Sequence, residues 1–159
     1  MLRAGNVELR RAAIGDLDRV VALQQAAYAP NRVVLGVEPI PLMADYNAIL
    51  FDMEVWLAEE AGDLRGVLIL EPRADDLLVW SVAVSPAAQG SGLGRALLAA
   101  TEERARQLGR DTVRLYTGTV LTDRVAWYAR HSYAVERIEE LSDRSVTHMI
   151  KRLSSPAAA

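Results

Sequence analysis

A short run rich in glycine is the part of this sequence best suited to bind a ligand. The run reads, in order, Gln89, Gly90, Ser91, Gly92, Leu93, Gly94 and Arg95. It lies between an apolar run at residues 77–84 and a long amphipathic pattern, so the sequence predicts a strand, a tight turn and a helix. Glycine lets the backbone adopt positive φ and approach a ligand closely, and the first N–H groups of a helix have no intrahelical partner. The turn is therefore expected to bind an anion, best a phosphate or pyrophosphate.

The spacing of the glycines distinguishes this turn from two other phosphate-binding loops. A dinucleotide-binding turn has the pattern G-x-G-x-x-G, whereas this one has G-x-G-x-G, with Arg95 at the place of the last glycine. A Walker loop ends in Lys followed by Ser or Thr, and neither follows Gly94. Neither loop fits this sequence, and an ordinary tight turn between a strand and a helix remains an alternative.

The turn resembles motif A of the GNAT acetyltransferases, whose pattern is Q/R-x-x-G-x-G/A. Its fixed positions are filled by Gln89, Gly92 and Gly94, and the Val-Ala-Val-Ser-Pro run before them is the same kind of strand end. The resemblance implies that residues 89–95 bind the pyrophosphate of acetyl-CoA, the cosubstrate. It also implies that a backbone N–H of the preceding strand binds the thioester carbonyl, and the backbone in question belongs to Val82, Ala83 and Val84.

A second resemblance to the family concerns Tyr128. Residues 115–128 are similar to the end of the fifth strand and to the following helix in one bacterial GNAT subgroup, where the matching tyrosine protonates the departing thiolate. A phenol, with a pKa of ~10, is protonated at neutral pH and can donate to a thiolate, whose conjugate thiol has a pKa of ~8.5. Gly118 and Arg124 replace two asparagines of the subgroup pattern. Without the resemblance, Tyr128 beside Trp127 would be interpreted as a core aromatic residue.

Residues 36–46 resemble the segment that borders the acceptor site in the same subgroup, where a Pro-x-Pro run and a later Asp-Tyr pair follow the first helix. This resemblance makes Asp45 and Tyr46 candidate substrate-binding residues. The alternative is a proline-stiffened loop in which Asp45 starts a helix.

The sequence does not identify a general base. An amine must be neutral to attack a thioester, so a lysine acceptor, with a pKa of ~10.4, needs a base or desolvation. GNAT enzymes often place a carboxylate on the fourth strand, but residues 77–84 contain none. Ser81, the only hydroxyl there, could hold a water, and Glu38 and Asp45 are candidate bases on the acceptor side.

Hydrophobic periodicity and turn residues predict the elements around these positions. Helices are expected at residues 17–29, 42–50, 93–108 and 123–130, and strands at 7–12, 54–59, 65–71, 77–84, 112–117, 133–139 and 146–153. Residues 31–41 are expected to be irregular, and Thr122 is the expected N-cap of the last helix.

The order of these elements mixes hairpins with crossovers, which is typical of a mixed sheet in an α/β or α+β domain. GNAT domains have the same order. The resemblance therefore implies the GNAT acyl-CoA N-acyltransferase fold, in which about four helices flank a central mixed β-sheet. We expect a single domain at residues 1–153 and a disordered tail at residues 154–159.

Composition excludes several other functions. The 159 residues are 51% hydrophobic and 25% charged, with a formal net charge of −3, which argues against a nucleic-acid-binding surface. There is no cysteine, and the two histidines, His131 and His148, are far apart, so no metal is expected. No signal peptide is expected, and no apolar run reaches the ~20 residues that a membrane helix requires. The expected location is cytoplasmic, without membrane contact.

The leading hypothesis is an N-acetyltransferase that transfers the acetyl group of acetyl-CoA to an amine of a small molecule or peptide. The alternative is a non-catalytic acyl-CoA-binding sensor or partner domain of the same fold. Gly118, Arg124 and the absence of a strand carboxylate favour the alternative, whereas Tyr128 favours the enzyme. The acceptor is not identified, and a homodimer is left open.

Overall fold

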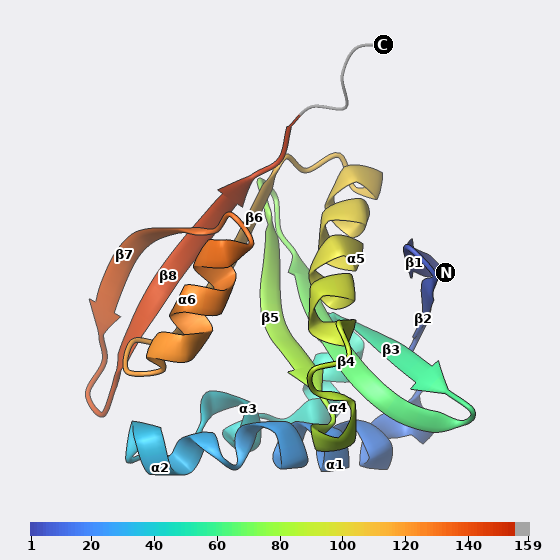
Figure 1. The fold of residues 1–159 in the computed structure, drawn as a ribbon, viewed down its shortest axis with the longest axis horizontal. Coiled ribbons are helices and arrows are strands. Elements are labelled where there is room, and N and C mark those ends of the chain that lie inside the picture. The colour runs from blue at the N-terminus through green and yellow to red at the C-terminus, as the bar shows by residue number, and fades with distance from the viewer. Residues whose placement is uncertain (155–159) are drawn as a thin grey trace.

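The computed structural model describes residues 1–154, and most of the tail expected to be disordered lies outside this part. The chain forms one mixed sheet with the strand order β1-β2-β3-β4-β5-β6-β8-β7 (Figure 1). The strands are β1 (Leu2–Ala4), β2 (Val7–Arg11), β3 (Glu54–Glu60), β4 (Asp63–Pro72), β5 (Leu77–Val84), β6 (Thr112–Gly118), β7 (Ala134–Glu140) and β8 (Ser145–Arg152). All neighbouring strands pair antiparallel except β5 and β6, which pair in parallel.

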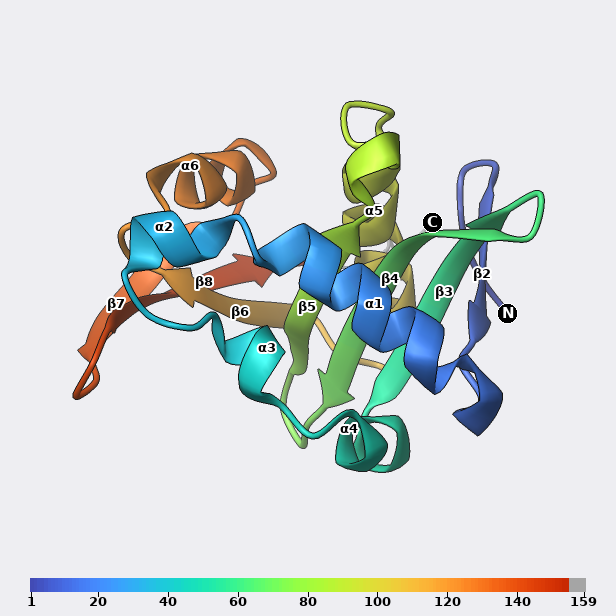
Figure 2. The ribbon, with the colours of Figure 1, turned by 90° about the horizontal axis from the view of Figure 1, so that it is seen from below.

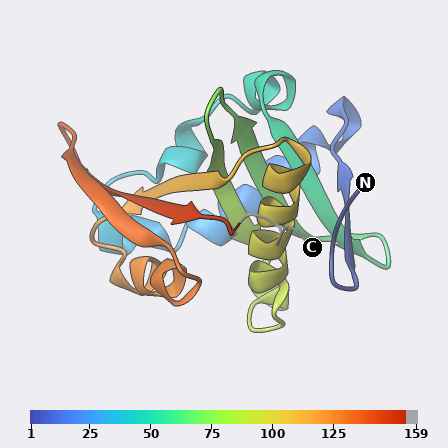
Figure 3. The ribbon, with the colours of Figure 1, turned by 90° about the horizontal axis from the view of Figure 1, so that it is seen from above.

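Helices cover both faces of this sheet. They are α1 (Leu17–Tyr28), α2 (Asn31–Leu35), α3 (Ile40–Met43), α4 (Tyr46–Asp52), α5 (Leu93–Gln107) and α6 (Thr122–Arg130), with 3₁₀ turns η1 (Ile14–Asp16) and η2 (Pro86–Ala88). Figure 2 shows α1, α3 and α4 in front of the sheet, and Figure 3, from the opposite side, shows α5 and α6 on the other face. The predicted mixed α/β fold with flanking helices is therefore confirmed.

The alternation of side chains along β4 explains why both faces need cover. Leu68 and Leu70 are fully buried in the core beneath α5, whereas Val67 and Ile69 are fully buried in the core beneath α1 and α4. Successive residues of a strand point to opposite faces, so a strand that is apolar at every position must lie between two layers. The run of apolar residues in β4 and β5 thus fixes the three-layer arrangement.

The sheet opens between β5 and β6. The two strands pair only from Leu77–Val113 to Val79–Leu115, and Figure 2 shows them diverging beyond that point. On its other side β5 stays paired with β4, but the register shifts because Ile69 pairs with Ser81 and Leu70 with Val79, leaving Trp80 as a bulge. The second half of β5 therefore has a strand partner on one side only, and its other edge lies outside the strand pairing.

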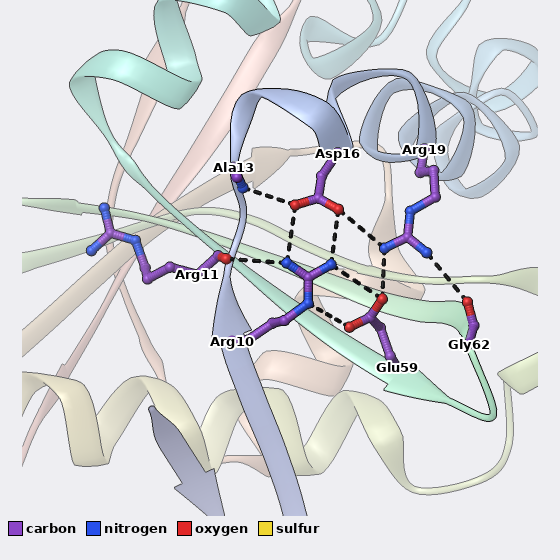
Figure 4. A network of polar contacts seen from close by, with 7 residues as sticks. All are labelled: Arg10, Arg11, Ala13, Asp16, Arg19, Glu59 and Gly62. Atoms are coloured by element: carbon purple, nitrogen blue, oxygen red, sulfur yellow. Dashed lines mark hydrogen bonds and ion pairs between the residues drawn. The ribbon is translucent and has the colours of Figure 1, made fainter.

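A network of charged side chains fixes the start of α1 (Figure 4). The Arg10 guanidinium donates to both carboxylate oxygens of Asp16, at 2.8 and 3.0 Å, and its Nε donates to Glu59 at 2.6 Å. Arg19, on α1, also donates to Glu59, at 2.6 Å. The hydrogen bond from Arg10 holds the pKa of the buried Asp16 carboxyl well below its usual range. The network joins β2, β3 and α1, and so positions the helix whose far end carries Tyr28.

Two local details differ from the prediction, namely an additional first strand and the N-cap of α6. The chain begins with a hairpin of β1 and β2, in which Gly5 has a φ of 59°. Only the second strand was predicted, because three residues are too few to show the two-residue period. The N-cap of α6 is Leu121, without a side-chain hydrogen bond, so the prediction of Thr122 as the cap is wrong.

The segment predicted to be irregular is partly helical. Pro30 follows α1 and is also the N-cap of α2, because its fixed φ of −59° suits the start of a helix. Gly36, at a φ of 71°, ends α2. The single helix predicted at residues 42–50 is two helices, since Asp45 leaves the helical conformation and caps α4.

Candidate active site

The glycine-rich turn connects β5 and η2 to the start of α5. Gly90 and Gly92 have φ values of 82° and 87°, in the left-handed region that favours glycine, and Gly92 is the N-cap of α5. Ala96 N–H donates to the Gly92 carbonyl at 3.1 Å, so the preceding N–H groups of Gly94 and Arg95 have no carbonyl partner one turn earlier. These donors and the positive end of a 15-residue helix are suited to bind an anion.

The glycines of this turn serve two purposes. A Cβ at Gly90 or Gly92 would meet nothing within 4 Å, so the turn faces open space. A Cβ at Gly94 would lie 3.2 Å from Cζ2 of Trp127, which means that Gly94 lets the start of α5 pack closely against α6. The absence of a side chain at Gly94 therefore allows α6 to lie close to the turn.

The open edge of β5 presents backbone groups towards the same region. The Val82 carbonyl accepts a hydrogen bond from Arg124 Nη2 at 3.0 Å and from the Tyr28 hydroxyl at 3.3 Å. In a strand the N–H and C=O of one residue point to the same side, so the Val82 N–H also faces this edge. Gln89 Nε2 donates to the Val84 carbonyl at 3.4 Å, which connects the turn to the end of the strand.

Two pockets meet at this edge. The first, which we call the turn pocket, brings together most of the predicted cofactor-binding residues, namely Val82, Ala83, Val84, Gln89, Gly90, Gly92, Gly94 and Arg95. Ser91 and Leu93 line a separate pocket near β1–β4, and the Leu93 side chain packs against the core. The second, the tyrosine pocket, is lined by Tyr28, Tyr116 and Tyr128 among others. Four residues line both pockets, namely Tyr28, Asn31, Val82 and Arg124.

Tyr128 lies at the wall of the tyrosine pocket. It is 5% exposed, and its ring makes edge contacts with Trp127 and Tyr133 at centroid distances of 5.1 and 5.8 Å. Burial raises the pKa of its hydroxyl, and the positive charge of Arg124, 5.7 Å from the ring centroid, opposes that shift. Tyr128 is thus both a core aromatic residue and a protonated donor beside a pocket.

Ser81 and Tyr46 belong to one buried hydrogen-bond network. Gln24, which is fully buried, donates through Nε2 to the Tyr46 hydroxyl at 2.9 Å and to Ser81 Oγ at 3.0 Å. Tyr46 donates in turn to the Pro41 carbonyl at 2.6 Å, and burial raises its pKa to about 12. Ser81 Oγ lies 2.8 Å from the Tyr28 hydroxyl and lines the tyrosine pocket, whereas Tyr46 supports the wall from behind.

The structure does not bring the two candidate carboxylates to this site. Glu38 accepts a hydrogen bond from Arg32 Nε at 2.7 Å in an exposed ion pair. Asp45 Oδ1 accepts from the N–H groups of Asn47 and Ala48 at 3.0 and 3.3 Å, as the N-cap of α4, and it lines a different pocket. In the part of the chain that the structure describes, the lining of the tyrosine pocket includes no carboxylate.

We expect Asp45→Ala to lower the free energy of unfolding by about 1 kcal/mol, because the first turn of α4 loses its acceptor. Asp45→Asn is the matched control, since asparagine also caps helices and should retain most of the stability. Thermal unfolding measures both variants. A base role would instead show as a loss of activity shared by both, with the asparagine variant still stable.

Sequence reasoning missed most of the tyrosine pocket. Tyr28 fits the apolar pattern of α1, and nothing in its spacing indicates that its hydroxyl meets β5. Arg124 is visible in the sequence as a replacement for a family asparagine, but its contact with Val82 is not. Arg144, which lines the same pocket from the β7–β8 connection, carries no sequence signal.

Comparison with known proteins identifies the family. The model of the Acetyltransferase (GNAT) family matches residues 20–133, so the chain belongs to this family. The matched range contains the turn, the open edge of β5 and α6.

Individual relatives agree at the level of the fold and the family. A mycothiol acetyltransferase of Sanguibacter keddieii is 41% identical over 68 residues, covering 38% of this chain. The chain spans 22% and 56% of the lengths of the curated relatives it matches. A GNAT acetyltransferase structure from Elizabethkingia anophelis with acetyl-CoA bound is 15% identical, covers 94% of this chain and 99% of its own, and has a TM-score of 0.74. The ribosomal-protein-S18-alanine N-acetyltransferase of Escherichia coli is 18% identical and has a TM-score of 0.76. Its alignment covers 96% of this chain and 97% of that protein.

Two further observations concern residues 1–154. None of the helices there combines the length and the apolar character needed to cross a membrane. The same residues include no group of three or more His, Cys, Asp or Glu side chains placed to bind a metal.

Proposed function

We propose that this protein is an acetyl-CoA-dependent N-acetyltransferase that acetylates an amine of a small molecule or peptide. The observation that carries the proposal is the meeting of two pockets at Val82. One contains the anion-binding turn, and the other contains a buried tyrosine and can admit an acceptor. The family, and the acetyl-CoA bound in a related structure, support the same cosubstrate.

Different residues near the open edge of β5 bind acetyl-CoA, stabilise the developing charge and protonate the leaving group. The N–H groups at the start of α5 bind the pyrophosphate, and acetyl-CoA supplies the acetyl thioester. The Val82 N–H donates to the thioester carbonyl oxygen as negative charge develops there. As the amine nitrogen attacks the thioester carbon and the C–S bond breaks, Tyr128, protonated at neutral pH, donates its proton to the departing thiolate. The nitrogen loses its proton to water, and Tyr128 regains a proton from water.

The tyrosine pocket also explains how the acceptor amine can lose its charge without a carboxylate base to deprotonate it. Its walls are largely apolar or aromatic, and burial disfavours a charged ammonium group. Burial therefore lowers the pKa of a bound amine, so desolvation replaces the base that the sequence does not identify.

The experiment that tests the proposal is free-thiol release from acetyl-CoA, measured with and without a panel of amines, amino acids and peptides. We expect release that depends on the amine, with the acetylated product identified by mass spectrometry. CoA binding without amine-dependent release would favour the non-catalytic sensor, for which Gly118 and Arg124 in place of family asparagines are the supporting observation.

A further inference from the structure

We infer that the acceptor is a free α-amino acid whose carboxylate binds the guanidinium of Arg124. The inference rests on the proposed function and adds the chemical class of the acceptor. It starts from the position of Arg124, in the first turn of α6, where its side chain lines both pockets.

Arg124 is held at this junction by a carbonyl and by aromatic rings. Its Nη2 donates to the Val82 carbonyl at 3.0 Å. Its guanidinium carbon lies 6.0 Å from the ring centroid of Tyr28, 5.9 Å from that of Trp127 and 5.7 Å from that of Tyr128. These contacts orient the guanidinium without neutralising its charge, and a guanidinium has five N–H donors, of which the bond to Val82 uses one.

The charge of Arg124 has no counter-ion among residues 1–154. No carboxylate of this part of the chain lies within 4.0 Å of it, whereas Arg10 and Arg114 each contact two. The other cation of the tyrosine pocket, Arg144, is already paired in a two-pronged contact with Asp143 at 3.0 and 3.1 Å. A partly desolvated cation without a partner is costly, so an anion that enters the pocket gains a strong charge-assisted pair.

The position of Arg124 relative to Val82 limits how far the anionic group of the acceptor can lie from its amine. Arg124 binds the carbonyl of the residue whose N–H faces the same open edge. The amine that attacks at this edge therefore carries its anionic group only a few bonds away. A planar carboxylate matches the planar guanidinium through two parallel hydrogen bonds, and an α-amino acid has this separation of amine and carboxylate.

The test compares each standard amino acid with its C-terminal amide as acceptor for acetyl-CoA. We expect kcat/KM to favour the amino acid by about 10- to 100-fold, the usual contribution of a charge-assisted hydrogen bond. In Arg124→Gln, which keeps an amide donor but removes the charge, the ratio should fall to about 1. Arg130→Gln is the matched control, since Arg130 lies on the same helix but lines neither pocket, and should retain the preference.

Other outcomes overturn the inference in distinguishable ways. Equal use of amino acids and amides by the parent protein would overturn it and leave the acetyltransferase intact. A preference for succinyl-CoA over acetyl-CoA that Arg124→Gln abolishes would assign the guanidinium to the acyl group instead. If no amine is acetylated, the proposed function fails. Calorimetric binding of amino acids and amides to the CoA-bound protein then tests the inference about the ligand of Arg124 by itself. Selective binding of amino acids supports the inference, and its absence overturns it.

Discussion

Gly92→Glu is expected to lose CoA binding, with a Kd at least ~100-fold above that of the parent protein. Gly92 is the N-cap of α5, and a side chain there enters the open space in front of the free N–H groups. A carboxylate about 4 Å from a phosphate is repelled by about 4 kcal/mol at a dielectric constant typical of a protein surface. Isothermal titration calorimetry with CoA measures the change.

Gly109→Glu separates this repulsion from backbone strain. Gly109 follows the other end of the same helix, with a φ of 69° and nothing within 4 Å of a Cβ, so the two variants share the cost of a left-handed residue, about 1–2 kcal/mol. Both should keep the parent circular dichroism spectrum, and only Gly92→Glu should lose CoA binding. Normal CoA binding by a folded Gly92→Glu variant would show that the turn is not the phosphate site.

The strand, turn and helix of the candidate site could be predicted because their signals are local in the sequence. An apolar run, alternating glycines and an amphipathic pattern follow one another, and each determines its own backbone conformation. The structure forms β5, the turn and α5 from these same residues, with the helix beginning at Leu93. Glycine permits the positive φ that Gly90 and Gly92 adopt, whereas Gly94, in the same run, has no positive φ because it lies within α5.

The acceptor side could not be predicted in the same way, because its walls come from distant segments. Tyr28, Ser81 and Arg124 meet only because α1 and α6 both reach the open edge of β5. The bulge at Trp80 and the divergence of β5 from β6 depend on the pairing of whole strands. Asp45, which the sequence could interpret either as a substrate contact or as a helix start, caps α4 in the structure.

Tyr128→Phe is expected to lower kcat by ~10²-fold or more, because the leaving thiolate loses its proton donor. The KM for acetyl-CoA should change little, since this contact matters chiefly in the transition state. A general acid acts while protonated, so activity falls as pH rises through its pKa. Burial raises the pKa of Tyr128, which places this fall above the usual ~10. The alkaline decrease in kcat should therefore be absent from the variant.

Two other tyrosines make this test specific. Tyr133→Phe is the structural control, because Tyr133 is buried against the Tyr128 ring and its hydroxyl has no hydrogen-bond partner within residues 1–154. Its kcat should match that of the parent protein. Tyr28→Phe examines the other hydroxyl, which lines both pockets and lies 2.8 Å from Ser81 Oγ. If Tyr28→Phe loses kcat and the alkaline decrease while Tyr128→Phe keeps both, the proton comes from α1 rather than from α6.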